Sequence, residues 1–196
     1  MSKQMAFYVE QKHCTGCSAC QIACKDKHNL PVGQNFRRIH AYEGGGFTIS
    51  GNVVHQNTYA YWIPVSCNHC VDAPCIAVCP SKAIYKRQED GLVLINEKSC
   101  IGCRRCFLVC PYQAPQFDAA TSKMKKCDFC QDLLLQGTAP ACVSACPMRV
   151  LGYGELSELQ KKYGNTSWVK GLPNTAKIKP AWVLVPHRDA VLVETM

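Results

Sequence analysis

Sixteen cysteines, gathered into four blocks of four, constrain this chain of 196 residues more than any other feature of its sequence. No cysteine lies outside the blocks. The blocks are Cys14-x2-Cys17-x2-Cys20-x3-Cys24, Cys67-x2-Cys70-x4-Cys75-x3-Cys79, Cys100-x2-Cys103-x2-Cys106-x3-Cys110 and Cys127-x2-Cys130-x11-Cys142-x3-Cys146. Any fold of this chain must therefore accommodate four dense groups of cysteine thiols, which are soft metal ligands.

The spacing within the first and third blocks matches the ligand run that bacterial ferredoxins use for a [4Fe–4S] cluster, and Pro111 follows the third block as it does in that run. We predict one cluster for each block, which gives about 16 iron atoms per chain. A row of four clusters is a path for single electrons, so the pattern predicts electron transfer.

The local geometry of a block suits a cubane cluster. A tight Cys-x2-Cys-x2-Cys loop can wrap three corners of the cubane, and Gly16 and Gly102 allow the backbone to approach closely because glycine tolerates positive φ. The last two cysteines of each block are four residues apart, so on a helical turn they share a face. Proline follows the last cysteine of blocks two to four, whereas Lys25 follows Cys24 in block one.

Structural zinc and disulfides are the alternatives. Cys-x2-Cys pairs are common in zinc sites, and the fourth block alone fits a zinc ribbon, but runs of four close cysteines suit a closed zinc site poorly. A structural zinc module that bridges partners is thus the opposing functional class, which brown colour and a reduced-state EPR signal would distinguish from an iron–sulfur protein. Eight disulfides would normally accompany a secretion signal.

The chain contains an internal repeat with an offset of 86 residues. Residues 7–17 align with residues 93–103, each copy being a short apolar strand followed by Cys-x-Gly-Cys. Residues 75–84 align in the same way with residues 142–151. The order is A-B-A′-B′, as expected from a duplicated two-cluster unit.

The segments outside the blocks are too long to be connectors alone, and we interpret them as docking surface. Within the insertion 25–66, a hairpin is predicted over 44–54 and a strand over 58–63. Ser157 and Gln160 form a capping-box pattern for a short helix that ends near Gly164. Further strands are predicted over 91–95 and, within an extended tail 171–195, over 181–185.

Composition and charge bear on two properties of the chain, its dependence on metal for folding and its binding to nucleic acid. The hydrophobic share of 47% includes the cysteines, so the ordinary apolar core is modest, and we expect the metal-free chain to be unfolded or aggregating. The formal charge of +8 would suggest nucleic acid, but four clusters with thiolate ligands add roughly −2 each and leave the loaded chain near neutral. We therefore predict no nucleic-acid partner.

No stretch approaches the ~18 apolar residues of a membrane span, and residues 1–10 lack the apolar region of a signal peptide. We therefore expect no membrane anchor and no export signal in this chain. No hydrolytic triad, phosphate loop or dinucleotide fingerprint is present, so we predict that the chain is not itself a catalyst.

Several other side chains near the blocks receive no ligand role. His13 and His69 could donate a hydrogen bond to a cluster or lie at the surface, and we favour the second because each block already holds four thiolates. We expect aromatic side chains of the insertion to pack a sheet; they are Tyr59, Tyr61 and Trp62. We expect basic side chains near the blocks to be solvated; they are Lys82, Arg104, Lys125 and Arg149.

The four blocks, in this order and with these gaps, resemble the iron–sulfur electron-transfer subunits of the complex iron–sulfur molybdoenzymes. Within that group the chain is similar to the iron–sulfur subunits of dimethyl sulfoxide reductases. The segments that carry this likeness are residues 36–39, 55–61, 66–70 and 100–104.

The resemblance implies an α+β fold of two interlocked ferredoxin-like lobes, with a hairpin insertion and an extended C-terminal tail. Residues 1–66 and 118–196 would form the first lobe and residues 67–117 the second. The fourth cysteine of a block would join the partner block of its lobe. The implied ligand sets are Cys14, Cys17, Cys20 and Cys146; Cys24, Cys127, Cys130 and Cys142; Cys67, Cys70, Cys75 and Cys110; and Cys79, Cys100, Cys103 and Cys106. Some relatives have tryptophan at the position of Cys103 and carry a three-iron cluster; the cysteine here predicts four irons.

The resemblance also implies partners, a direction and a location. The first lobe would face a molybdopterin catalytic subunit, and the second a membrane anchor that oxidises quinol, in a heterotrimer of anaerobic respiration. The same path would serve another oxidant as the alternative: polysulfide, tetrathionate, selenate or another N- or S-oxide. The chain would be membrane-associated through its partner, on the periplasmic face, with the cytoplasmic face as the alternative.

Overall fold

A three-stranded sheet is built around the apolar N-terminal strand β1 (Met5–Glu10). β1 pairs antiparallel with β10 (Leu151–Glu155) and parallel with β11 (Trp182–Val185). Five of its six residues are buried, as expected for a strand covered on both faces. Helix α6 (Leu156–Tyr163) packs against the sheet, and its Tyr163 ring stacks on Tyr8 with centroids 3.9 Å apart. The computed structural model describes residues 3–173, 175 and 178–191.

The sequence repeat is also a repeat of strand pairing. β7 (Val93–Ile95), which precedes block three, pairs antiparallel with β6 (Ile84–Lys86), which follows block two. β1, which precedes block one, pairs in the same way with β10, which follows block four. The register is identical in the two copies, because Val9 faces Leu151 as Ile95 faces Ile84. The backbone thus brings block one to block four and block two to block three.

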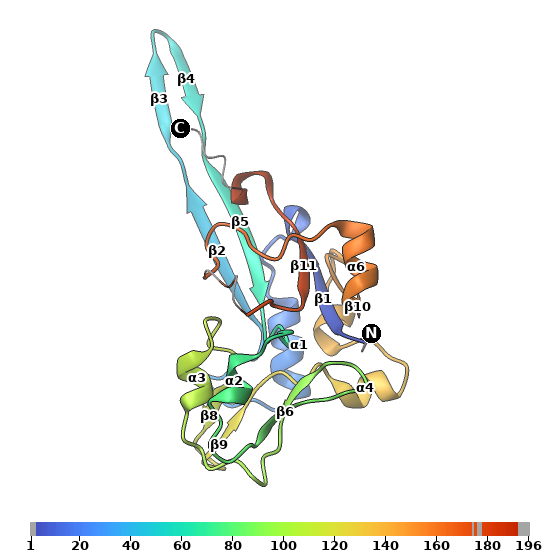
Figure 1. Ribbon diagram of the computed structural model, residues 1–196. Helices are drawn as coiled ribbons and strands as arrows, with labels where there is room; N and C mark the ends of the chain where they lie inside the picture. The colour runs from blue at the N-terminus through green and yellow to red at the C-terminus, as the bar shows by residue number, and fades with distance from the viewer. Residues whose placement is uncertain (1–2, 174, 176–177, 192–196) are drawn as a thin grey trace.

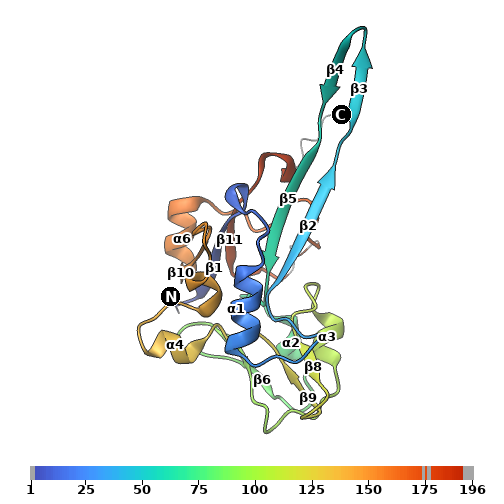
Figure 2. The same ribbon diagram turned by 180° about the vertical axis from the view of Figure 1, so that it is seen from behind.

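A long two-stranded arm projects from the body (Figures 1 and 2). Its base is the antiparallel pair β2 (Arg38–Gly44) and β5 (Tyr59–Val65), and its tip is the hairpin of β3 (Phe47–Ser50) and β4 (Val53–Gln56). The hairpin and the following strand are confirmed as predicted. Tyr61 is buried and stacks between Tyr42 and Tyr59, so the aromatic side chains of β5 do pack a sheet.

Each block contributes a short helix, and the residue after its last cysteine sets the helix length. α2 (Pro74–Ala77), α3 (Arg105–Val109) and α5 (Ala141–Ser144) all end before the last cysteine of their block, where proline disfavours a helical conformation in the preceding residue. α1 (Ala19–Lys27) continues past Cys24, since Lys25 imposes no such restriction. α1 packs against α5 and α2 against α3, which repeats the strand pairing.

The remaining elements complete the body. α4 (Gln131–Leu135) follows Cys130, and β8 (Gln116–Asp118) forms a hairpin with β9 (Lys123–Lys125). Two 3-10 turns, η1 (Gln11–His13) and η2 (Arg188–Ala190), follow β1 and β11. The strands expected over 91–95 and 181–185 are confirmed by β7 and β11. Positions 174, 176–177 and 192–195 of the predicted tail lie outside the described residues.

The capping box predicted at Ser157 is wrong, although the helix and its end at Gly164 are confirmed. The helix begins one residue earlier, at Leu156, with Glu155 at the N-cap and no side-chain capping hydrogen bond. Ser157 Oγ instead donates a hydrogen bond of 2.8 Å to Glu155 Oε1. The backbone N–H of Leu156 donates a hydrogen bond to Gln4 O, next to strand β1, and this bond fixes the residue at which the helix starts.

The apolar core is divided in two. The larger part surrounds the three-stranded sheet and the base of the arm, and the smaller surrounds the β6–β7 and β8–β9 hairpins. Cysteines are members of both parts, so the thiols belong to the core itself. None of the helices that the structure describes is both long enough and apolar enough to span a membrane.

Candidate metal centres

Two cavities are each lined by four cysteines. One contains Cys14, Cys17, Cys20 and Cys146, and we call it the first site. The other contains Cys67, Cys70, Cys75 and Cys110, and we call it the third site. Among the residues that the structure describes, no carboxylate or imidazole lines either cavity; the other lining groups are mainly apolar side chains and prolines. Such an all-thiol donor set suits iron–sulfur clusters and not a hard cation.

The second site comprises the buried thiols of Cys24, Cys127, Cys130 and Cys142. Burial raises the pKa of Cys24 to about 12, and the neighbouring thiols of Cys142 and Cys130 add to the shift. Burial also raises the pKa of Cys127, again with Cys24 and Cys142 as neighbours. Cys24 is thus a neighbour of Cys127, Cys130 and Cys142, and Cys127 also adjoins Cys67 of the third site.

We call the group of Cys79, Cys100, Cys103 and Cys106 the fourth site. Burial raises the pKa of Cys106 to about 11, and Cys100 and Cys103 are the nearest thiols that contribute. Cys79 packs against the same small core as Cys100 and Cys106. Burial acts against its thiolate, but hydrogen bonds from the Ile84 backbone and the Ser81 hydroxyl outweigh that and lower its pKa.

The four sites follow one another in a row. Cys20 of the first site lies near Cys142 of the second, Cys127 of the second near Cys67 of the third, and Cys75 of the third near Cys106 of the fourth. Only two cysteines are exposed, Cys17 and Cys103, and they belong to the first and fourth sites. The row therefore reaches the surface through exposed thiols at both ends.

The backbone around the sites repeats unusual torsions. Gly16 and Ser18 in block one have φ of 67° and 61°, and Gly102 and Arg104 in block three have 68° and 62°. Glycine is required at position 102 for a second reason, since a Cβ there would stand 2.3 Å from Ser122 O. These left-handed residues direct amide groups at sulfur: Gly102 N–H donates to Cys100 Sγ over 3.4 Å. Backbone donors of this kind stabilise thiolates.

Two buried basic side chains adjoin the sites and were not anticipated from the sequence. Arg37 is 1% exposed and Lys126 is 6% exposed. In the sequence they are visible only as members of the basic pairs Arg37-Arg38 and Lys125-Lys126. The position of Lys126 directly before Cys127 is the one local signal that could have pointed to it.

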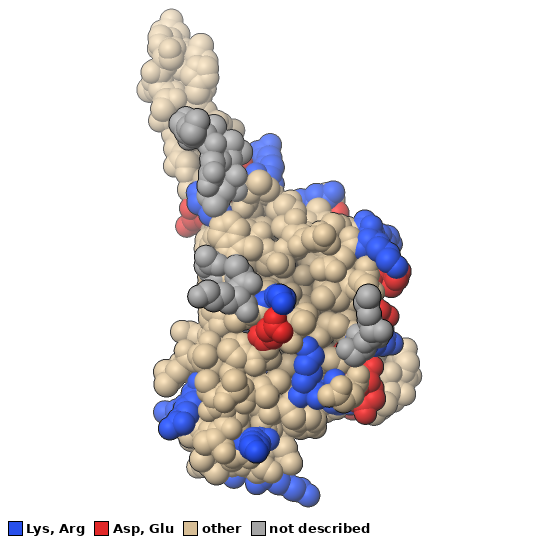
Figure 3. All heavy atoms as spheres, in the orientation of Figure 1, with Lys and Arg blue, Asp and Glu red and all other residues tan. Residues whose placement is uncertain are grey.

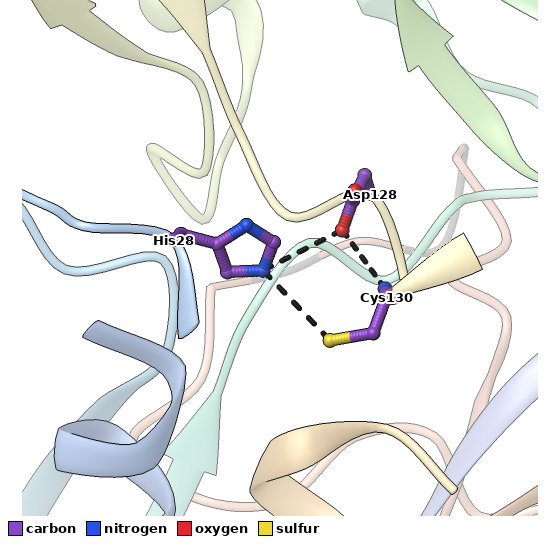
Figure 4. Close-up of side chains that lie close together, drawn as sticks. All are labelled: His28, Asp128 and Cys130. Carbon is purple, nitrogen blue, oxygen red and sulfur yellow. Dashed lines mark hydrogen bonds and ion pairs between the residues drawn. The ribbon is translucent and has the colours of Figure 1, made fainter. Parts of the chain in front are cut away.

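Three histidines near the sites differ in their exposure and in their contacts. His13 is largely exposed beside Glu10, as expected. The expectation of a surface position is wrong for His69, which is 1% exposed, because the backbone of Val93 covers it and donates to its Nδ1 over 3.0 Å. His28 at the end of α1 was not singled out from the sequence; its Nε2 lies 3.8 Å from Cys130 Sγ and 3.5 Å from Asp128 Oδ1 (Figure 4).

Most of the basic side chains expected in solvent are exposed; these are Lys82, Arg104 and Arg149. Arg104 nonetheless lies over the Phe117 ring, 3.8 Å from its centroid. Lys125 is half-buried because it forms a 2.8 Å ion pair with Asp118.

Comparison with known proteins agrees with this description. The family model of the 4Fe-4S dicluster domain matches residues 58–156. The B subunit of the anaerobic dimethyl sulfoxide reductase of Escherichia coli K12 is 44% identical over 190 residues, which cover 97% of this chain and 92% of that protein. The B subunit of the polysulfide reductase of Wolinella succinogenes is 36% identical over 96% of this chain and 97% of its own length. The thiosulfate reductase electron transfer subunit PhsB of Salmonella typhi is 37% identical over 84% and 83%.

An all-thiol row of sites on an α+β scaffold, together with the dicluster domain, defines a ferredoxin-like iron–sulfur protein. Its cofactors are four [4Fe–4S] clusters, so the zinc alternative is not favoured. The protein belongs to the family of iron–sulfur subunits that includes the B subunit of anaerobic dimethyl sulfoxide reductase. It is a non-catalytic electron-transfer subunit of an oxidoreductase complex.

Proposed function

We propose that the chain passes electrons from a membrane subunit that oxidises quinol to a molybdopterin catalytic subunit, as part of a dimethyl sulfoxide reductase-like complex. The observation that carries this proposal is the row of four thiol sites with exposed cysteines only at its two ends. Electrons can then enter at one end and leave at the other, while the middle sites stay shielded from water and from unwanted oxidants.

We assign each site as the ligand set of one cluster, so all sixteen cysteines are ligands. The two cysteine-lined cavities support the first and third assignments, and the mutual influence of neighbouring thiols supports the second. In the fourth, the same influence supports Cys100, Cys103 and Cys106, and Cys79 is supported by its packing against the small core that contains Cys100 and Cys106. A bound [4Fe–4S] cluster supplies a carrier for one electron. The protein contributes thiolates, buried walls and the backbone N–H groups near the sulfurs.

We also propose the two interlocked lobes, with residues 1–66 and 118–196 in the first and 67–117 in the second. The repeated strand register and the pairing of α1 with α5 and α2 with α3 support this division. The hairpin of β8 and β9 crosses the proposed boundary, and its Met124 packs in the smaller core. The lobes are therefore joined by more than a linker.

The first lobe, which carries the arm, is proposed to face the catalytic subunit, and the second lobe to face the membrane anchor. The complex would be a heterotrimer held peripherally at the periplasmic face, with the cytoplasmic face as the alternative. Another oxidant is the second candidate, because the B subunit of a polysulfide reductase matches nearly the whole chain at 36% identity.

An anaerobic pull-down from detergent-solubilised membranes tests the partners first. We expect a large molybdopterin subunit and a multi-span membrane protein to co-purify, and the large subunit will identify the substrate class. Recovery of the chain alone, or with soluble partners only, would retain the clusters but refute the quinol-linked role.

The two exposed cysteines test the orientation. In Cys103→Ser, electron entry from quinol should fail while electron exchange with the catalytic subunit persists; in Cys17→Ser the pattern should be the opposite. Iron analysis should find a loss at one site only in each variant. The reverse assignment of the two defects would reverse the proposed orientation.

A further inference from the structure

Arg37 and Lys126 are buried, and neither has an acidic partner among the described residues. They are the only arginine and lysine side chains that are buried in the part of the chain described by the structure. Every ion pair there involves other residues. A buried charge is costly unless an opposite charge or hydrogen bonds compensate it. Their hydrogen bonds go to neutral carbonyls, so an anionic group other than a carboxylate would offset the charge that remains.

Arg37 lies where the first and second sites meet. The thiols beside it belong to both sites, Cys20 to the first and Cys24, Cys127 and Cys142 to the second. Nη1 donates to Pro64 O over 2.8 Å, and the guanidinium carbon is 4.6 Å from the centre of the Phe7 ring. Nε and Nη2 are buried and have no acceptor among the described residues. The single N–H of Nε and the two N–H groups of Nη2 are thus available to donate to sulfur.

Lys126 lies where the second and third sites meet. It lines the cavity of the third site, and its Nζ donates to the carbonyls of Val93 and Cys127. The thiols beside it are those of Cys67 and Cys75 of the third site and of Cys127 of the second. It therefore stands between the two proposed lobes.

We propose that Arg37 and Lys126 compensate the negative charge of successive clusters and raise their reduction potentials, Arg37 at the first and second sites and Lys126 at the second and third. A cluster with four thiolate ligands is anionic, and reduction adds one more negative charge. A fixed cation in a low-dielectric interior favours that reduced state. This inference rests on the proposed ligand sets, and it predicts that both residues act on the second cluster.

The test is an EPR-monitored redox titration of the intact, cluster-loaded complex, accompanied by iron analysis. Lys126→Met removes the charge at nearly constant length, and Lys126→Arg keeps it. Arg37→Met and Arg37→Lys form the equivalent pair. Lys125→Met is the matched control, since it removes one positive charge at the adjacent residue, whose side chain is 28% exposed.

Lys126→Met should lower the potentials of the second and third clusters, and Arg37→Met those of the first and second. If a variant cannot hold its full complement, the same two clusters should be the ones lost. The charge-keeping variants and Lys125→Met should show neither effect. Four clusters at unchanged potentials in the Met variants, an equal shift of all four, or an equal effect in Lys126→Arg would overturn the inference. Lack of four clusters in the unmodified complex would instead refute the proposed ligand sets.

Discussion

Gly16 lies against the indole ring of Trp62, so closely that a Cβ at position 16 would stand 2.5 Å from Trp62 Cδ1 and Nε1. Gly16 belongs to the loop of block one, and Trp62 belongs to strand β5 at the base of the arm. Real Cβ atoms are essentially never found so close to another atom. The loop that carries Cys14, Cys17 and Cys20 therefore packs tightly against the base of the arm. A shift of the arm would change the conformation of that loop.

Replacing Gly16 with alanine should destabilise the loaded protein by about 2–5 kcal/mol, because it combines an unfavourable φ of 67° with a clash against a large ring. The first cluster should be lost preferentially. Gly137→Ala is the matched control, since Gly137 has a φ of 72° and no other described residue lies within 4 Å of the position that a Cβ would take there. It should cost only about 1–2 kcal/mol. Equal losses of thermal stability and iron in the two variants would contradict this account.

Phe129 should be one of the most sensitive positions of the core. Its ring is fully buried and stacks on Phe7 with centroids 4.1 Å apart, which joins block four to strand β1. Phe129→Ala should destabilise the loaded protein by about 3–5 kcal/mol, measured as a lower anaerobic Tm. Phe47→Ala makes the same substitution at a side chain that is 67% exposed, and should change stability by less than about 0.5 kcal/mol. Similar Tm values for the two variants would exclude this role for the stack.

The strands and turns around the sites were predictable from the sequence where their determinants are local. One short segment of sequence contains Cys14, Cys17 and Cys20 with Gly16 between the first two. The strands of the arm likewise depend on short segments of sequence. The internal repeat of the sequence also appears in the structure, because Val9 pairs with Leu151 as the equivalent residues Ile95 and Ile84 pair with each other. The association of block one with block four came only from resemblance, because no local pattern encodes which distant segment a strand will pair with.

The environments of Arg37, Lys126 and His69 could not be predicted for a related reason. Burial is produced by segments remote in sequence: Pro64 accepts from Arg37, and Val93 contacts both Lys126 and His69. Basic residues are usually exposed, so residue type alone predicts an exposed position for Arg37 and Lys126. Their burial can be predicted only once the positions of the surrounding thiol sites are known. The cost of burying these cations makes sense only when the negative charge of the metal centres is included.

The tip of the arm should matter for assembly and not for stability. Its large apolar side chains Phe47, Ile49, Val53 and Val54 are all more than half exposed, and no charged residue interrupts the tip in Figure 3. An isolated two-stranded hairpin is marginally stable in water, so a partner surface is expected to cover it. Phe47→Ser with Ile49→Ser should reduce co-purification of the proposed catalytic subunit while iron content and Tm stay unchanged.

The result is specific if the membrane anchor still co-purifies with that double variant, because the anchor is assigned to the other lobe. Leu135→Ser serves as the control, since Leu135 is 81% exposed on α4, away from the arm. Normal recovery of the catalytic subunit with the double variant would show that the arm is not its docking segment.

Removal of iron should unfold the chain. Six of the sixteen cysteines belong to the larger buried core. Burial raises the pKa of Cys20 to about 11 and those of Cys24 and Cys75 to about 12, so without metal these three thiols stay neutral at pH 7. Neutral thiols no longer compensate Arg37 and Lys126, and an uncompensated buried charge costs several kcal/mol. Anaerobic chelation under reducing conditions should therefore abolish the cooperative thermal transition and enlarge the hydrodynamic radius, and reconstitution with iron and sulfide should reverse both changes. A metal-free chain that keeps native far-UV ellipticity and a cooperative transition would show that the apolar core suffices without the clusters.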